Sequence, residues 1–152
     1  MKITICGSIA FIEEMIRTKR DLEQMGHEVK MPPTQIEDDR GNIISVVDIY
    51  NRRKTANETE TWIWDRKTEA MKNHFNKVEW ADAILVLNYD KKGIAGYIGA
   101  NTLLEMGLAF HLAKPIYLLQ QIPEIDSKEE ILGMRPIIIE NDLRFIPLSI
   151  DK

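Results

Sequence analysis

The segment KITICGSIAFIEEMIRTKRDLEQMGHEVKM, residues 2–31, decides the fold class. It begins with a β-rich run at residues 2–6 that ends at Gly7. Apolar residues then recur at helical spacing up to Gly26, a residue that commonly follows the end of a helix. Residues 27–31 form a second β-rich run. A strand, a crossover helix and a second strand make up the unit from which parallel sheets are built.

The rest of the chain continues this alternation. Residues 34–57 show no clear period, so we expect a long loop there, with a short helix and a basic cluster at 51–54. The pattern then predicts helices at 58–79, 102–113 and 127–132, and strands at 83–87, 115–119 and 136–139. These elements predict one α/β domain over residues 1–152. Its fold would be Rossmann-like or flavodoxin-like, with a five-stranded, mostly parallel sheet and helices on both faces.

Charge and composition limit the functions that are possible. The net charge of -4 and the pI near 5.4 argue against binding to a nucleic-acid polymer, which usually needs a basic face. Binding of an anionic small molecule is still compatible with the acidic composition, because a few backbone N–H groups can hold a phosphate. Cys6 is the single cysteine, so no intramolecular disulfide can form. No signal peptide or membrane-length apolar run is evident, and we expect a cytoplasmic protein without membrane contact.

Several polar or small residues follow the predicted strands, where ligands bind in sheets of this kind. Gly7, Ser8 and Ile9 follow the first strand, and Asn88 and Asp90 follow the strand at 83–87. A glycine permits a tight turn, and a serine can cap the next helix while its hydroxyl faces an anion. We expect these residues to contact a substrate. A plain helix cap at Ser8 and a turn at Asp90 are the alternatives.

The stretch GANTLLEMG, residues 99–107, is the most informative for chemistry. Thr102 and Glu105 have the spacing of a capping box, which satisfies free N–H groups at the start of a helix. Alternatively, Glu105 lies one turn into the helix and faces the strand ends, as a nucleophile or a ligand of a ribose hydroxyl. Gly99, Asn101 and Thr102 would then border the substrate. The helix is apolar nearly all round, which favours a homodimer or larger oligomer.

Three segments carry a family resemblance: ICGSI at 5–9, ADAILVLNYD at 81–90 and GANTLLEMGLAFHLAKPIYLL at 99–119. Together they resemble the nucleoside 2-deoxyribosyltransferase superfamily, which includes the 2'-deoxynucleoside 5'-phosphate N-hydrolases. The resemblance implies that Glu105 attacks the anomeric carbon of a nucleoside or nucleotide and displaces the base. Water or a second base then resolves the glycosyl-enzyme. It also implies no cofactor, and sites built between subunits.

The chain departs from the family pattern at three places. The transferases usually carry an aspartate six residues before the glutamate, where this chain has Gly99. The N-hydrolases follow the GSI segment with a phosphate-binding arginine, where this chain has Ala10. They also have an aspartate at the position that corresponds to His74 here. An imidazole can do acid–base work near neutral pH, although His74 also has the helical spacing to pack beside Met71 and Val78.

Other functions remain open at this stage. His27 and His111 have no cysteine or carboxylate at metal-ligand spacing, so the sequence predicts no metal site. A nucleotide-binding or signalling module that lost turnover is one alternative. A cytokinin-activating phosphoribohydrolase is another, although the PGGxGT loop and arginine-rich helix of that group are missing. The sequence does not separate hydrolase from transferase.

Overall fold

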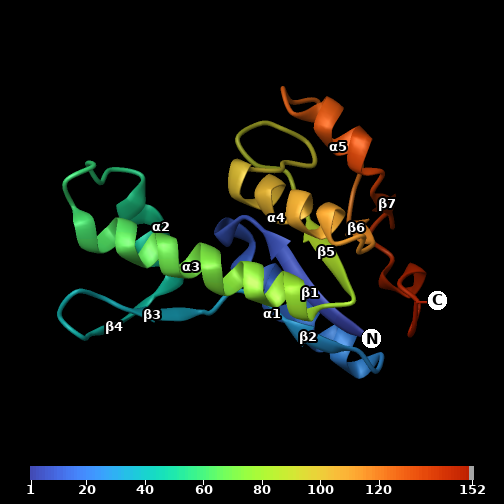
Figure 1. The fold of residues 1–152 in the computed structure, drawn as a ribbon, viewed down its shortest axis with the longest axis horizontal. Helices are drawn as coiled ribbons and strands as arrows, with labels where there is room; N and C mark the ends of the chain where they lie inside the picture. The colour runs from blue at the N-terminus through green and yellow to red at the C-terminus, as the bar shows by residue number, and fades with distance from the viewer. Residues whose placement is uncertain (151–152) are drawn as a thin grey trace.

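The computed structural model describes residues 1–150, which are built around one parallel sheet (Figure 1). Its five strands are β1 (Lys2–Gly7), β2 (Glu28–Lys30), β5 (Ala83–Leu87), β6 (Ile116–Leu118) and β7 (Ile137–Ile138). They lie in the order β2-β1-β5-β6-β7, and all four neighbouring pairs are parallel. Counted within the sheet this order is 2-1-3-4-5, the flavodoxin-like order, so the predicted fold class is confirmed.

Helices cover both faces of the sheet. They are α1 (Ile12–Gln24), α2 (Val46–Arg53), α3 (Thr61–Trp80), α4 (Ala100–His111) and α5 (Lys128–Met134), with short 3₁₀ turns at Ile9–Phe11 and Leu143–Phe145. Successive side chains of a strand point to opposite faces, and β5 accordingly feeds two apolar clusters. Ala83 and Leu85 pack with residues of α1, whereas Ile84 and Val86 pack with residues of α3, α4 and α5.

The segment 34–57, called the arm below, is more ordered than the sequence predicts. It contains an antiparallel hairpin of β3 (Gln35–Glu37) and β4 (Ile43–Ser45), followed by α2. The carboxylate of Asp38 closes the hairpin turn by accepting the N–H groups of Arg40 and Asn42. In Figure 1 the arm extends to the left, and α3 runs from beside it to the sheet. The expected short helix is present as α2, whereas the expected long loop contains a hairpin, because three-residue strands leave too short a pattern to recognise.

The start of α4 corrects a second expectation. The helix begins at Ala100, with Gly99 as a cap that makes no side-chain hydrogen bond. Thr102 and Glu105 both lie inside the helix and are 3% exposed, so they do not form a capping box. Glu105 thus lies deeper in the molecule than a capping residue, which leaves its carboxylate free for another role.

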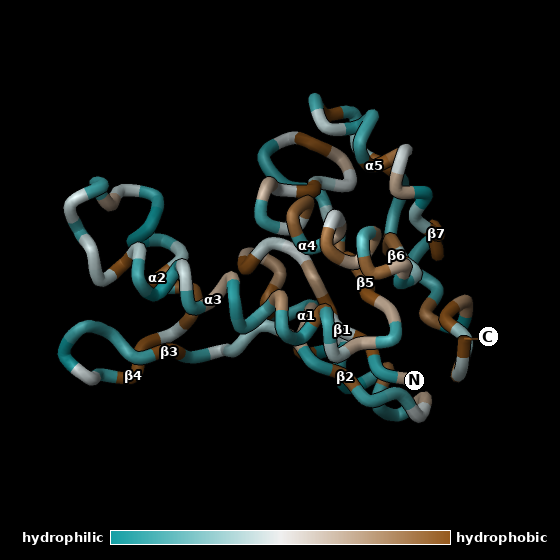
Figure 2. Tube along the Cα trace, in the orientation of Figure 1, coloured by the Kyte–Doolittle hydropathy of each residue, from teal (hydrophilic) through white to brown (hydrophobic). Residues whose placement is uncertain are grey.

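Figure 2 shows where apolar residues collect. They concentrate on β5, β6 and α4, whereas the turns of the arm are hydrophilic. On α4, however, Leu104 and Phe110 are 52% and 56% exposed. The single chain therefore leaves part of this apolar helix uncovered, and burial by a second subunit stays a prediction. Within residues 1–150 no helix combines the length and the apolar character that a membrane span requires.

Candidate active site

Glu105 is a carboxylate buried at the start of α4. Its Oε1 accepts a hydrogen bond of 2.8 Å from the amide of Asn101, one helical turn earlier, whereas Oε2 has no hydrogen-bond partner within residues 1–150. Burial penalises the charged form and raises the pKa of Glu105 to about 7, although the nearby Cys6 thiol, the charge of Lys67 and the hydrogen bond from Asn101 oppose the shift. A carboxyl group with this pKa changes charge near neutral pH, as groups at active sites often do.

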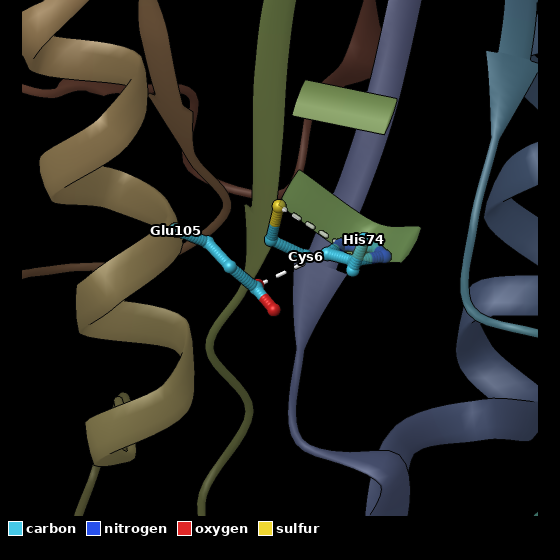
Figure 3. Close-up of side chains that lie close together, drawn as sticks. All are labelled: Cys6, His74 and Glu105. Atoms are coloured by element: carbon cyan, nitrogen blue, oxygen red, sulfur yellow. Dashed lines mark hydrogen bonds and ion pairs between the residues drawn. The ribbon is translucent and has the colours of Figure 1, made fainter. Parts of the chain in front are cut away.

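Two further side chains complete a buried cluster with Glu105 (Figure 3). His74 comes from α3, and its Nε2 lies 3.6 Å from Glu105 Oε2. Cys6 comes from β1, and its Sγ lies 3.5 Å from the same nitrogen. Burial, helped by the charge of Lys77, lowers the pKa of His74 to about 4, and burial raises the pKa of the Cys6 thiol. At pH 7 the imidazole and the thiol are therefore both neutral.

The cluster lies at a pocket of about 590 Å³, called the Glu105 pocket below. Parallel pairing sets Gly7 of β1 beside Leu87 of β5, so the loops after both strands leave the sheet at the same edge. The arm and α3 form one side of the pocket, and the end of β1 and the start of α4 form the other. Five residues predicted from the sequence line it: Gly7, Ile9, His74, Asn101 and Glu105.

Two cations line the same pocket. Arg53 comes from the end of α2 and Lys67 from α3, and burial lowers the pKa of both, with the charge of Arg53 adding to the effect on Lys67. Neither forms an ion pair with a carboxylate of residues 1–150. The ammonium of Lys67 donates to Asn101 Oδ1 at 3.4 Å. Glu105 is close enough to Lys67 to oppose the lowering of its pKa, but two half-buried cations that form no ion pair with the described residues still provide a place for an anionic group.

Ser8 and Asn88 form hydrogen bonds within the loops that follow β1 and β5. The Ser8 hydroxyl accepts the N–H two residues later and the ammonium of Lys91. Asn88 is fully buried; its amide donates to the carbonyl of Gly96, and its Oδ1 accepts the N–H of Gln120. These bonds tie the loops after β5 and β6 together. Neither side chain lines the Glu105 pocket.

Asp90, Gly99 and Thr102 also lie apart from the pocket lining. The Asp90 carboxylate accepts the N–H of Gly96 at 3.0 Å and borders a separate hollow of about 610 Å³. A Cβ atom at Gly99 would lie 3.2 Å from the hydroxyl oxygen of Tyr97, so the small residue allows this close contact. Thr102 is buried within α4. Of the ten site residues predicted from the sequence, five line the Glu105 pocket and the other five do not.

The sequence matches no protein-family model and no curated protein. Among solved structures, the chain is similar to a 2-deoxyribosyltransferase from the psychrotolerant bacterium Bacillus psychrosaccharolyticus. The identity is 21%, with 78% of this chain and 72% of that chain covered and a TM-score of 0.45. It is also similar to a conserved protein from Enterococcus faecalis V583, with 18% identity, 88% and 74% coverage and a TM-score of 0.45. We therefore base the function on the chain's own residues.

Proposed function

We propose that this chain cleaves or exchanges the N-glycosidic bond of a nucleoside or nucleotide, with Glu105 as the nucleophile. The observation that carries the proposal is the free Oε2 of a buried carboxylate at the floor of a ligand-sized pocket. The resemblance of residues 99–119 to the deoxyribosyltransferase superfamily supports the same role for this glutamate. The volume of the pocket also falls within the range of small-molecule sites, roughly 300–1,000 Å³.

The reaction would be a double displacement. Glu105 attacks the anomeric carbon, a glycosyl ester forms, and the bond to the base nitrogen breaks while the base takes up a proton. Water then attacks the same carbon, loses a proton and releases the carboxylate; a second base in place of water gives exchange. The nucleophile must be ionised, and a pKa of about 7 allows this at neutral and higher pH.

We propose that His74 does not donate the proton that the leaving base takes up. A pKa of about 4 leaves the imidazole neutral at pH 7, so it is a poor reservoir of the leaving proton. With its hydrogen on Nε2, the neutral ring donates toward Oε2 of Glu105, 3.6 Å away, and closes on it as the carboxylate ionises. We propose that His74 orients the nucleophile in this way.

Arg53 and Lys67 support a phosphorylated substrate. Their cationic groups line the pocket that holds Glu105, without carboxylate partners among the described residues. A phosphate monoester would pair with both of them, and this pairing would repay the desolvation of two cations. The phosphate site would then come from the arm and α3, and it would replace the arginine that is missing at Ala10.

The decisive assay follows release of free base from a panel of nucleosides and 5'-monophosphates, with and without a second base. Glu105→Gln should lower the rate on the order of 10³-fold or more while the fold is kept. The matched control is Glu79→Gln, because Glu79 is an exposed carboxylate on α3 away from the pocket. A Glu105→Gln protein with the wild-type rate would exclude the nucleophile role.

The same panel of substrates tests whether Arg53 and Lys67 recognise the phosphate of a 5'-monophosphate. Arg53→Gln and Lys67→Met should raise KM for the monophosphate at least about tenfold more than KM for the matching nucleoside. Arg52→Gln is the matched control, because its guanidinium stacks on Trp62 and does not line the pocket. Equal changes of KM for both substrates would show that the two cations do not recognise phosphate.

One observation favours a second candidate, a nucleotide-binding module without turnover. The position six residues before Glu105 is Gly99, which caps α4 and offers no acidic group. Calorimetry separates the two functions: a module would bind a 5'-monophosphate tightly and release no base during long incubation.

A further inference from the structure

Three different ligand types meet at the floor of the Glu105 pocket. A thiol from β1, an imidazole from α3 and a carboxylate from α4 point toward one another (Figure 3). His74 Nε2 lies 3.5 Å from Cys6 Sγ and 3.6 Å from Glu105 Oε2, and all three ligand atoms lie within 4.8 Å of one another. A tetrahedral Zn²⁺ has bonds of about 2.3 Å to sulfur and about 2.0 Å to nitrogen or oxygen, which places its ligand atoms roughly 3.3–3.6 Å apart. The two separations at His74 Nε2 are close to that geometry, and the third, between Cys6 Sγ and the Glu105 carboxylate, is no longer than 4.8 Å.

Hydrogen bonding alone leaves this cluster incomplete. Glu105 Oε2 is buried and has no hydrogen-bond partner within residues 1–150, and an unpaired buried polar atom is costly. The proton of the neutral His74 ring can lie on either nitrogen, because Nδ1 accepts no hydrogen bond from the described residues that would hold the proton on Nε2. With the proton on Nδ1, Nε2 presents a lone pair toward Cys6 and Glu105. A cation between the three side chains would therefore engage every ligand atom at once.

The charges and the exposure of the cluster also suit a metal ion. Cys6 is fully buried behind the pocket, whereas His74 and Glu105 line it. With three protein ligands, a fourth position would remain for water or substrate, the arrangement of catalytic zinc sites. The thiol would release its proton to solvent on binding. Thiolate and carboxylate then balance the two positive charges of the ion, although Lys67 lies nearby.

We propose that Cys6, His74 and Glu105 bind a thiophilic divalent cation, with Zn²⁺ preferred over Mg²⁺ or Ca²⁺. A thiolate and an imidazole are ligands that Zn²⁺ favours, whereas Mg²⁺ and Ca²⁺ require oxygen ligands. This site goes beyond the proposed function, because it uses the same carboxylate for a different purpose. While the cation is bound, Glu105 is unavailable as a nucleophile, so Zn²⁺ inhibits base release.

Co²⁺ binding to the full chain tests the site without any activity measurement. The chelator-treated protein is titrated with Co²⁺, and thiolate-to-cobalt charge transfer is followed in the near ultraviolet. Because Cys6 is the only cysteine, the band reports this residue alone. We expect one Co²⁺ per chain, and loss of the band when one equivalent of Zn²⁺ is added. Absence of a charge-transfer band at excess Co²⁺ would overturn the proposal.

Substitutions at the three side chains test which of them bind the cation. Cys6→Ser should abolish the band, and His74→Asn and Glu105→Gln should each weaken binding by at least about tenfold. His111→Asn is the matched control, since His111 is exposed near the end of α4, and its affinity should equal the wild type. Circular dichroism shows which variants are folded. If Cys6→Ser is unfolded, the other two variants decide the question, because wild-type affinity in both refutes the site.

Base release is then measured on cation-free protein and again with Zn²⁺. If the cation-free protein is inactive but binds Co²⁺, the proposed reaction fails and the metal site stands. If the cation-free protein is active but does not bind Co²⁺, the metal site fails and the proposed reaction stands.

Discussion

Glu105→Gln should make the protein more stable at pH 8, because the wild type must bury a carboxylate there. The folded-state pKa of Glu105 is about 7, compared with an ordinary value of 4.5. Its stabilising contribution is fully present below about pH 4.5 and is lost as pH rises through about 7, since only the unfolded chain ionises easily in that window. A difference of 2.5 units (7 minus 4.5) corresponds to about 3 kcal/mol, at about 1.4 kcal/mol per unit.

The substituted glutamine keeps the shape of the side chain and can still accept the amide of Asn101, so the comparison isolates the charge. His74 gives the opposite trend: its folded-state pKa of about 4 lies below its usual 6.5, so stability is lost as pH falls toward 4. That trend is present in both proteins and cancels in their difference. The advantage of the variant should therefore grow from about pH 5 to pH 8, and reach roughly 6–12 °C in Tm.

Urea unfolding followed by circular dichroism at pH 5, 6, 7 and 8 measures the difference. Glu79→Gln, which removes an exposed carboxylate from α3, should follow the wild type at every pH. Parallel curves for the wild type and Glu105→Gln across the whole range would refute the reasoning, because they would mean that Glu105 ionises as easily in the folded chain as in the unfolded one.

Three further outcomes follow from the same structure. For base release, kcat/KM should rise with pH and level off above about 7, since Glu105 must be ionised; a profile that is flat between about pH 5.5 and 8.5 would contradict this. Asn88→Ala should lower the free energy of unfolding, measured in urea, by about 2–4 kcal/mol, because it removes the hydrogen bonds that join the loops after β5 and β6. A decrease below about 0.5 kcal/mol would refute that role. Phe110→Glu should convert an oligomer to a monomer in light scattering at micromolar concentration, and a monomeric wild type would remove the reason for the exposed apolar face of α4.

The sheet was readable from the sequence, and the arm was not. The strand at 83–87 was predicted with its observed limits, because burial on both faces makes it a continuous apolar run. The unit at 2–31 was equally clear, since Gly26 ends its helix. The hairpin in the arm has strands of only three residues, stabilised by a turn around Asp38 rather than by a periodic pattern.

The site was predicted in part for a similar reason. Counting along α3 placed His74 where the family has an acidic residue, and the structure brings it to Glu105. Cys6 was treated only as an unpaired thiol, because 68 residues separate it from His74 and no local pattern joins them. Arg53 fell within a basic cluster, but its position in the pocket depends on how the arm packs.

The Glu105 pocket joins two parts of the chain that obey different constraints. One part is the sheet with α3 and α4, where each substitution must satisfy a packed core, and the other is the arm, whose elements are short. His74 and Glu105 sit on α3 and α4, whereas Ile36, Val46 and Arg53 line the pocket from the arm. Ligand preference can therefore be re-engineered by exchanging residues 34–57 as a cassette, with the chemical machinery left in place.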